Sequence, residues 1–331
     1  MITEIEDAVI VWNYDDKYNG ARIMRVYTAM PSYTIPEYLD KIKVTSVGPY
    51  CFSDVNNVKR YMEISDDLKK RIETVTADKG FCEFCGNYIE SIGIADSVVE
   101  ISNNAFYNCR NMKKLLIGSM LTEFGSDIFM NCRKFHELDI NCNINEKTGL
   151  KQLLSRYGND LKVKFIVNGT VSAEIFYPEY TESYDEIAPA HIFGRNITGE
   201  GFRARQCFNN DVPDMAKYDK IFAKASVEES ISTVCEMAMS RLMYPVALGD
   251  SAREAYLDYI KTHDKEIVSI ITARKDIWRL KFLCQENRVS VAAVDAGIAC
   301  ASEMEWGEGV ASLLKWKHEF FDNIKKKRYE F

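Results

Sequence analysis

Apolar residues in the first half of the chain recur every 23 positions. The segments 101–117 and 124–140 align without a gap, and both contain Asn-Cys-Arg at the same place. The apolar residues that share this spacing are Ile101 and Phe124, Phe106 and Phe129, Cys109 and Cys132, Met112 and Phe135, Leu115 and Leu138, and Ile117 and Ile140. The period continues upstream through isoleucines in 89–94 and a degenerate unit in 47–61. We count about four repeats, with an irregular insertion at 66–79.

A 23-residue period lies within the roughly 20–29 residues of leucine-rich repeats. Leu115 and Ile117 are two positions apart, so a strand places both side chains on one face, toward the core. A single coil cannot bury its own apolar face, so neighbouring coils must stack. We therefore expect parallel strands near 92–94, 115–117 and 138–140.

The phenylalanines and cysteines of the repeat are predicted to be buried. Phe106 and Phe129 would fill the wall opposite the strands. Cys109 and Cys132 hold equivalent positions, where a small apolar residue with a weak donor suits a buried turn. We expect both thiols to be reduced and structural.

Over roughly residues 20–142, the chain resembles the BspA-type (treponemal) leucine-rich repeat family. The family's isoleucine, alanine-phenylalanine, cysteine and leucine-rich strand are matched by Ile101, Ala105, Phe106, Cys109, Leu115 and Ile117. Ala95 and Gly118 stand where the family has a proline after the strand. The resemblance implies a β-solenoid used for protein–protein contact, often at bacterial surfaces, and it brings no catalytic residues.

The segment after the repeats predicts a cap and a β-ribbon. Residues 147–157 are typical of a short helix that covers the end of a repeat stack. Alternating apolar residues in 163–184 flank Asn168-Gly169, a strong hairpin signal. An irregular stretch to about Pro213 is expected to follow.

The pattern from Lys217 onward is helical. The helices expected after the first are 230–244, 252–262, 265–273, 277–285, 290–302 and 308–325, with Ser290 as an N-cap. The last pair resembles the helix hairpins of ankyrin-like repeats in architecture only. Its packing is predicted to bring Val291, Val294 and Ile298 against Val310, Leu313 and Leu314.

The predicted fold class is therefore α+β. A leucine-rich-repeat β-solenoid with an N-terminal cap would span residues 1–145, and a capping helix, β-hairpin and irregular linker would span 146–213. An all-α helical-hairpin domain would span 214–331.

Charge and composition narrow the partners. Residues 1–142 hold 16 basic and 21 acidic side chains, and the rest hold 26 and 28, so neither part is basic. Nucleic acid is disfavoured because it requires clustered positive charge; the one basic run, 325–328, is typical of a solvated helix end. No apolar window is long enough to span a membrane. Ten cysteines behind an acidic N-terminus predict reduced thiols in the cytoplasm.

Few residues suggest chemistry. Cys82-x-x-Cys85 could be a redox pair or half a metal site, but no second pair follows and the four histidines are scattered. We interpret both cysteines as core residues and expect no metal, no cofactor and no enzyme activity.

The stretch Gly199–Phe208 contains Arg203 and Arg205, and arginine forks bind carboxylates and other anions. A possible anion-binding site is one interpretation. The interpretation we favour is a strand in which Phe202 and Ala204 face inward while the arginines pair with acidic neighbours.

The predicted partner-binding face consists of the outward strand positions. Lys114 and Leu116 alternate with inward residues on one coil, and Glu137 and Asp139 do so on the next. Leu116 is apolar where polar residues are usual, so it is the expected anchor.

The leading hypothesis is a non-enzymatic protein–protein interaction scaffold of bacterial type. Two alternatives remain open. One is a surface adhesin, which the resemblance implies if a leader precedes this chain. The other is a ligand-sensing or enzymatic C-terminal domain that the repeats target; a deep polar pocket at the two arginines would favour it.

Overall fold

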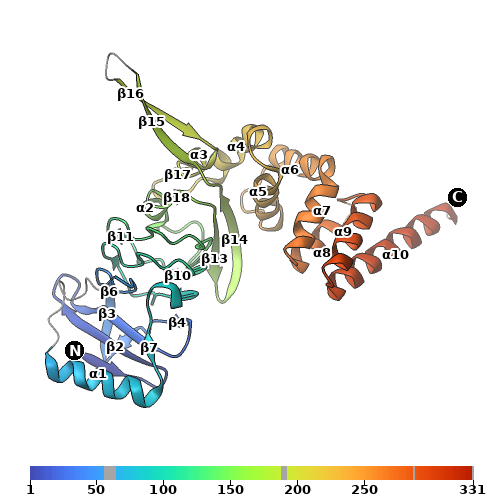
Figure 1. Ribbon diagram of the computed structural model, residues 1–331. Coiled ribbons are helices and arrows are strands. Elements are labelled where there is room, and N and C mark those ends of the chain that lie inside the picture. The colour runs from blue at the N-terminus through green and yellow to red at the C-terminus, as the bar shows by residue number, and fades with distance from the viewer. Residues whose placement is uncertain (56–64, 188–191, 286–287, 330–331) are drawn as a thin grey trace. The chain divides into compact units, whose positions relative to one another are not determined.

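The structure is a computed structural model that describes the chain except residues 56–64, 188–191, 286–287 and 330–331. Contacts divide it into two units, Met1–Asp214 and Met215–Phe331. The first unit holds β-sheets with a few helices, and the second is helical (Figure 1). This organisation is α+β, as the sequence predicts.

One six-stranded sheet carries the repeat strands. Its order is β14-β13-β12-β10-β8-β4, with bounds Thr170–Tyr177, Leu161–Val167, Glu137–Asn141, Lys114–Gly118, Ser91–Gly93 and Ser32–Thr34. The strands from β4 to β13 are parallel, and β14 is antiparallel to β13. Leu115 pairs with Ile92 on one side and Leu138 on the other, and all three are fully buried. The predicted parallel pairing at a 23-residue offset is confirmed.

The first unit also contains a second, eight-stranded sheet. Its main order is β1-β2-β3-β6-β9-β11, with bounds Ile2–Glu4, Ala8–Asp15, Gly20–Thr28, Ile42–Val47, Glu100–Ile101 and Glu123–Phe124. The short strands β5 (Tyr38–Leu39) and β7 (Cys82–Glu83) join it at β6 and β3. The first three strands are antiparallel, whereas β3, β6, β9 and β11 pair in parallel.

The phenylalanines and cysteines of successive repeats form columns. Phe52, Phe106 and Phe129 stack with centroid separations of 5.2 and 5.7 Å and nearly parallel rings. Cys109 is buried and its thiol donates to the carbonyl of Phe52 at 3.2 Å. Cys132 is likewise buried and donates to the carbonyl of Phe106 at 3.1 Å. The buried, hydrogen-bonded roles predicted for these thiols are confirmed, and all ten cysteines are free.

The insertion at 66–79 is not irregular, as the sequence led us to expect, but a 14-residue helix, α1 (Asp66–Lys79). Ser65 caps its first turn by accepting from the amide of Leu68, and Gly80 ends it in the left-handed conformation, with φ of 66°. These are ordinary start and stop signals. Only Ile72 of this helix is buried, so the sequence contains no apolar stripe that would have predicted the helix.

The predicted cap is present. Helix α2 (Leu150–Leu154) buries Leu150, Leu153 and Leu154 completely. Strands β13 and β14 form the expected hairpin, and its two turn residues, Asn168 and Gly169, have φ of 50° and 75°. Both positive values fit the primed turn that Asn-Gly favours.

Residues 181–213 are more ordered than the predicted irregular stretch. They form the hairpin β15 (Thr181–Ile187) and β16 (Ile192–Thr198), the single helical turn α3 (Gly201–Ala204), and the paired strands β17 (Phe208–Asn209) and β18 (Val212–Pro213). The described side chains of β15 are exposed on both faces, so the sequence lacks the alternation of apolar and polar residues that would have predicted a strand.

The helical unit contains α4 to α10, with bounds Met215–Glu228, Ile231–Met243, Asp250–Thr262, Asp264–Ala273, Ile277–Cys284, Val291–Glu303 and Gly307–Tyr329. The amide of Ala293 confirms Ser290 as an N-cap by donating to its hydroxyl. Val294 and Leu313 are buried as predicted, but Leu314 is 50% exposed. Leu314 follows a buried residue by one position, which points it to a different side of the helix. The side chains of the basic run 325–328 lie outside the described part.

The helical unit encloses a buried ion pair between α4 and α5. Arg241 donates to both carboxylate oxygens of Asp219, at 2.7 and 2.9 Å, and the Tyr256 hydroxyl donates to the same group at 2.8 Å. Arg241 and Tyr256 are fully buried or nearly so. The pair joins α4, α5 and α6, and the bidentate geometry suits an arginine rather than a lysine.

The cysteine column yields a stability test. Cys109→Asp places a charge in a fully buried site, so we expect the free energy of unfolding to fall by about 3 kcal/mol or more. Cys82→Asp is the matched control because Cys82 is exposed. Urea denaturation followed by circular dichroism measures both; equal losses for the two variants would contradict the column.

Candidate functional site

The outward face of the six-stranded sheet brings the predicted partner-binding residues together. Strand register aligns them in two rows across β8, β10, β12 and β13. The rows are Ser91, Lys114, Glu137 and Lys162, and Gly93, Leu116, Asp139 and Lys164. We call these eight positions the sheet face. It contains all four residues that the sequence indicated, in the order that the repeat predicts.

Ion pairs link neighbouring strands of the sheet face. The Lys114 ammonium lies 2.7 Å from a carboxylate oxygen of Glu137 and 2.6 Å from one of Asp139. The Lys164 ammonium lies 2.8 Å from the other oxygen of Glu137. Opposite charges on adjacent strands stabilise a sheet. These ion pairs link Lys114, Glu137, Asp139 and Lys164 into one charged network.

Lys164 was missed by the sequence analysis. The alternation of Leu161, Val163 and Phe165 with lysines was visible, but it was assigned to a separate ribbon. The parallel pairing of β13 with β12 makes it the next strand of the repeat sheet instead. The offset there is 25 residues, from Glu137 to Lys162, so the 23-residue period did not reveal it.

Burial differs sharply along the sheet face. The side chain of Asp139 is only 6% exposed, whereas that of Glu137 is 21% and that of Lys114 is 37% exposed. The sequence predicts Asp139 to be an outward residue of the binding face, yet its side chain is buried. Register places it between Leu116 and Lys164, which cover it from both sides. One of its oxygens, Oδ1, is buried without a hydrogen-bond partner.

Burial and ion pairing shift the two carboxylates in opposite directions. Burial opposes ionisation of Glu137, but its bonds to Lys114 and Lys164 outweigh burial and lower its pKa from 4.5 to about 2. For Asp139 burial is the largest effect and raises the pKa, because the attraction of Lys114 and Lys164 offsets burial only in part and Glu137 repels the charge. The same acids raise the pKa of Lys114 against the effect of burial. The network thus holds Lys114 and Glu137 firmly charged.

Leu116 is the half-buried apolar residue of the sheet face. Its neighbours in register are Gly93 and Asp139. A Cβ atom at Gly93 would lie 2.5 Å from the hydroxyl of Thr34, so this glycine lets β4 and β8 approach closely. The result is an apolar spot beside a ring of paired charges, which is the composition of a protein contact with an apolar centre and a polar rim.

Comparison with known proteins agrees with the geometry of the repeats. A family model described as "BspA type Leucine rich repeat region" matches residues 27–149 in six copies. Residues 27–149 are a BspA-type leucine-rich repeat region. The six copies exceed the roughly four counted from the sequence, because irregular units escape a count based on exact spacing.

Two further comparisons give less information than the family model. The chain is similar to a leucine rich cell surface protein from Faecalibacterium prausnitzii A2-165, with 20% identity and a TM-score of 0.28. The similarity covers 52% of this chain, which spans only 40% of the length of that protein. No curated protein matches the chain.

The two arginines next to the BspA-type region do not form a shared site. Arg205 is buried, and its guanidinium donates to the carbonyls of Tyr157, Asn159, Pro178 and Gly201. Arg203 is exposed and pairs with Glu200 at 3.1 Å. The expected strand is helix α3 instead, so side chains two positions apart do not share a face. Arg205 links separate backbone segments, and the N–H groups of its guanidinium already bind these carbonyls instead of a ligand.

The Cys82-x-x-Cys85 pair is not a pair of core residues, because Cys82 is exposed and Cys85 is half-buried. Burial and the nearby Glu83 carboxylate raise the pKa of Cys85 to about 11, which disfavours the reactive thiolate. Among the described residues, no group of three or more histidines, cysteines or carboxylates is placed to hold a metal ion. In the same part of the chain, no helix is long and apolar enough to cross a membrane.

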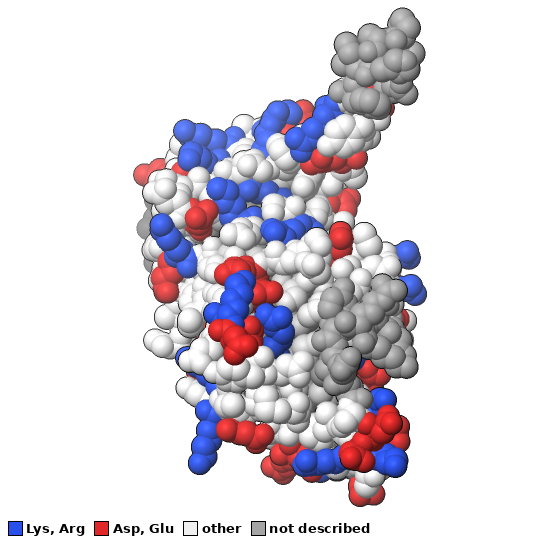
Figure 2. All heavy atoms as spheres, turned by 90° about the vertical axis from the view of Figure 1, so that its left-hand side faces the viewer, with Lys and Arg blue, Asp and Glu red and all other residues white. Residues whose placement is uncertain are grey.

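The second sheet has its own charged network. Lys17 lies 3.1 Å from Glu100 and 2.7 Å from Glu123, which are neighbours in register on β9 and β11. Figure 2 shows a compact cluster of mixed acidic and basic side chains on the face that lies to the left in Figure 1. A lysine between two parallel-paired glutamates relieves the repulsion that their register imposes.

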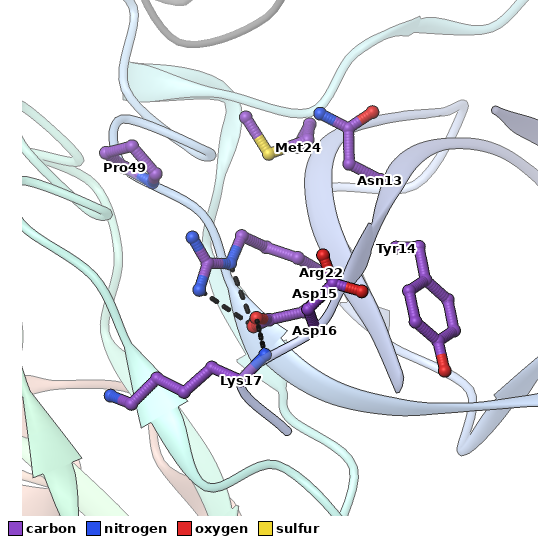
Figure 3. A pocket seen from close by; sticks show the side chains of 8 residues that line it. All are labelled: Asn13, Tyr14, Asp15, Asp16, Lys17, Arg22, Met24 and Pro49. Carbon is purple, nitrogen blue, oxygen red and sulfur yellow. Dashed lines mark hydrogen bonds and ion pairs between the residues drawn. The ribbon is translucent and has the colours of Figure 1, made fainter. Parts of the chain in front are cut away.

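A polar cavity of about 330 Å³ adjoins this network. Its lining residues are Asn13, Tyr14, Asp15, Asp16, Lys17, Arg22, Met24 and Pro49 (Figure 3). Arg22 and the backbone amide of Lys17 point at the carboxylate of Asp15, which also accepts from Ser46 at 2.5 Å. Because Asp15 is buried and holds several bonds, its role here is structural.

The sheet-face network makes a pH-dependent prediction. At pH 7, Glu137→Gln should lower the free energy of unfolding by about 3 kcal/mol, because a pKa of about 2 in place of 4.5 corresponds to roughly that energy. Asp139→Asn should change it by less than about 1 kcal/mol, because ionisation of this buried acid is itself costly.

The stability that Glu137 contributes is present above pH 4.5 and is lost as pH falls toward 2. The difference between wild type and Glu137→Gln should therefore shrink at pH 3. Urea denaturation at both pH values measures it. Equal destabilisation by the two variants, or a difference that does not depend on pH, would disprove the assignment.

Proposed function

We propose that this protein is a non-enzymatic interaction scaffold whose BspA-type repeats bind another protein through the sheet face. Leu116 carries the proposal. It is apolar, half-buried and outward on a strand whose other outward residues are polar or glycine. A half-exposed apolar residue set among paired charges fits the apolar centre and polar rim of a protein contact.

The paired charges around Leu116 favour specific binding over nonspecific hydrophobic association. Lys114 and Glu137 remain ionised across the physiological pH range. Ions that are already paired on the free protein lose less hydration energy when a partner covers them. A partner would place an apolar group on Leu116 and polar groups on the surrounding rim.

We also propose that the two parallel ladders wind as the coils of a solenoid. Support comes from the in-register parallel pairs on both sheets and from the columns of phenylalanine and cysteine between them. A stack of this kind presents equivalent positions of successive coils on one continuous surface, which repeat proteins use for binding.

We also propose that the protein has no enzymatic activity. In the described cavity beside β2 and β3, the one buried carboxylate is tied to Arg22 and Ser46. Near helix α3, the guanidinium of Arg205 is directed at backbone carbonyls rather than at a pocket. Neither place favours the alternative of a catalytic or ligand-sensing site.

A cytoplasmic location is likewise proposed, and the free state of all ten cysteines supports it. Proteins exposed to an oxidising exterior commonly pair their cysteines. Function as a surface adhesin is the alternative, and BspA-type repeats suit a surface role equally well.

The test replaces Leu116 with threonine, which keeps strand propensity and adds no charge beside buried Asp139. We expect Tm to change little, because the site is already half-exposed, and capture of the partner from a lysate of the source organism to fall at least tenfold. Quantitative mass spectrometry of the bound fraction measures the capture.

Met130→Thr is the matched control, since Met130 is an apolar residue of the same repeats that is 47% exposed but lies outside the sheet face. It should capture the partner as wild type does. If Leu116→Thr folds and still captures the same proteins, the sheet face is not the binding site.

A further inference from the structure

The hairpin of β15 and β16 lacks the support that other strands of its unit receive. It forms a two-stranded sheet of its own, and Figure 1 shows it extending beyond the other strands of that unit. Residues 181–185 and 195–198 are all exposed, so the described part of the ribbon buries none of these side chains against the body. Isolated two-stranded hairpins are marginally stable in water.

Local contacts stiffen the ribbon in place of a core. Arg195 on β16 donates to both oxygens of Glu182 on β15, at 3.1 and 2.6 Å. Further along, the amide of Asn196 donates to Asp185. These cross-strand bonds fix the register without burying apolar surface.

An aromatic and cationic stack fastens the base of the ribbon. The Arg195 guanidinium lies 5.1 Å from the ring of Phe202, which contacts the ring of Tyr180 edge-on at 5.5 Å. Tyr180 in turn lies 5.1 Å from Arg205, the buried arginine that binds four backbone carbonyls. This series of stacked side chains fixes the direction of the ribbon, while the ribbon itself extends into solvent.

The outer edge of β15 is unusually open. It runs over Thr181–Ile187 without a register shift and contains no proline, lysine or glycine. Natural proteins normally protect edge strands with proline, with charged residues and lysine above all, with bulges or with a covering element; of these, β15 has only acidic residues. Strand β16, by contrast, contains Gly194, which weakens a strand interior. The edge of β15 is therefore the better template for another strand.

We propose that β15 is a docking strand for an extended, basic segment of another protein, which pairs with its free edge. Asp185, which accepts from the neutral amide of Asn196, supplies negative charge, Glu182 shares its charge with Arg195, and β15 contains no basic residue. Tyr184 and Ile197, which are 63% and 38% exposed, supply apolar contacts beside the acids. Main-chain hydrogen bonds would provide affinity, and the acids would select lysine or arginine side chains. This surface is separate from the sheet face and does not depend on it.

A second copy of the chain is a poor occupant of this edge. Antiparallel pairing of β15 with itself about Tyr184 would place position 182 opposite position 186, and both are glutamates. Like charges directly opposite each other destabilise a strand pair. Pairing of β15 with β16 of another copy would be head-to-tail, which does not close into a dimer.

A pair of labelled peptides tests the proposal on the full chain. The probe is Lys-Thr-Lys-Val-Lys-Thr-Lys, and its control carries glutamate at each lysine. Fluorescence anisotropy at physiological salt should show saturable binding of the basic peptide and at least tenfold weaker binding of the acidic one. Hydrogen exchange read by mass spectrometry should then show slower exchange in the segment 181–187.

Two lysine variants locate the edge. Ser183→Lys puts a charge on β15 that repels the basic peptide, so binding should weaken at least fivefold. Thr198→Lys makes the same charge change at the root of β16 and should weaken binding twofold or less. Both residues are exposed, so folding should be retained.

The proposal is overturned if the basic peptide does not bind, if both peptides bind equally, or if protection appears outside 181–187. It is also overturned if sedimentation shows a dimer that Ser183→Lys dissociates. Failure of these tests leaves the sheet face untouched, because Leu116→Thr examines that surface independently.

Discussion

Parallel pairing at a constant offset is the constraint on which the repeat region depends. Because β10 pairs with β12 one repeat apart, each side chain of one strand lies beside its counterpart in the next repeat. Inward positions therefore form columns, which require an apolar or internally bonded side chain at each level. Phe106 on Phe129 meets that requirement through parallel rings, and each buried cysteine meets it by donating to the backbone of another repeat.

The same register makes the opposite demand on outward positions. Identical charged residues in successive repeats would lie side by side on paired strands and repel each other. The structure solves this by alternation, with Lys114, Glu137 and Lys164 carrying opposite signs from strand to strand. Where two glutamates do meet on the other sheet, Lys17 from a neighbouring turn lies between them. This is why inward positions repeat in the sequence and outward positions do not.

Buried arginines in this protein hold the backbone rather than ligands. Arg205 binds four carbonyls near the root of the β15–β16 hairpin, and Arg25 binds the carbonyls of Tyr50, Cys51 and Ser53 in the N-terminal sheet. A planar group with five donors can satisfy several loop carbonyls that no strand reaches. Such arginines allow irregular segments to leave the sheets in a fixed direction.

The sequence by itself determined the period, the parallel register, the buried cysteines and the helices from α4 to α10. These follow from spacing alone, because period 2, period 3.6 and a 23-residue repeat each leave a mark in the order of apolar residues. Only the tertiary structure decided the rest. It buried Asp139 between strands, joined β13 to the repeat sheet, turned Arg205 inward and left β15 uncovered. Each of these features depends on which segments contact each other in the folded chain, and the spacing of apolar residues along the sequence does not determine those contacts.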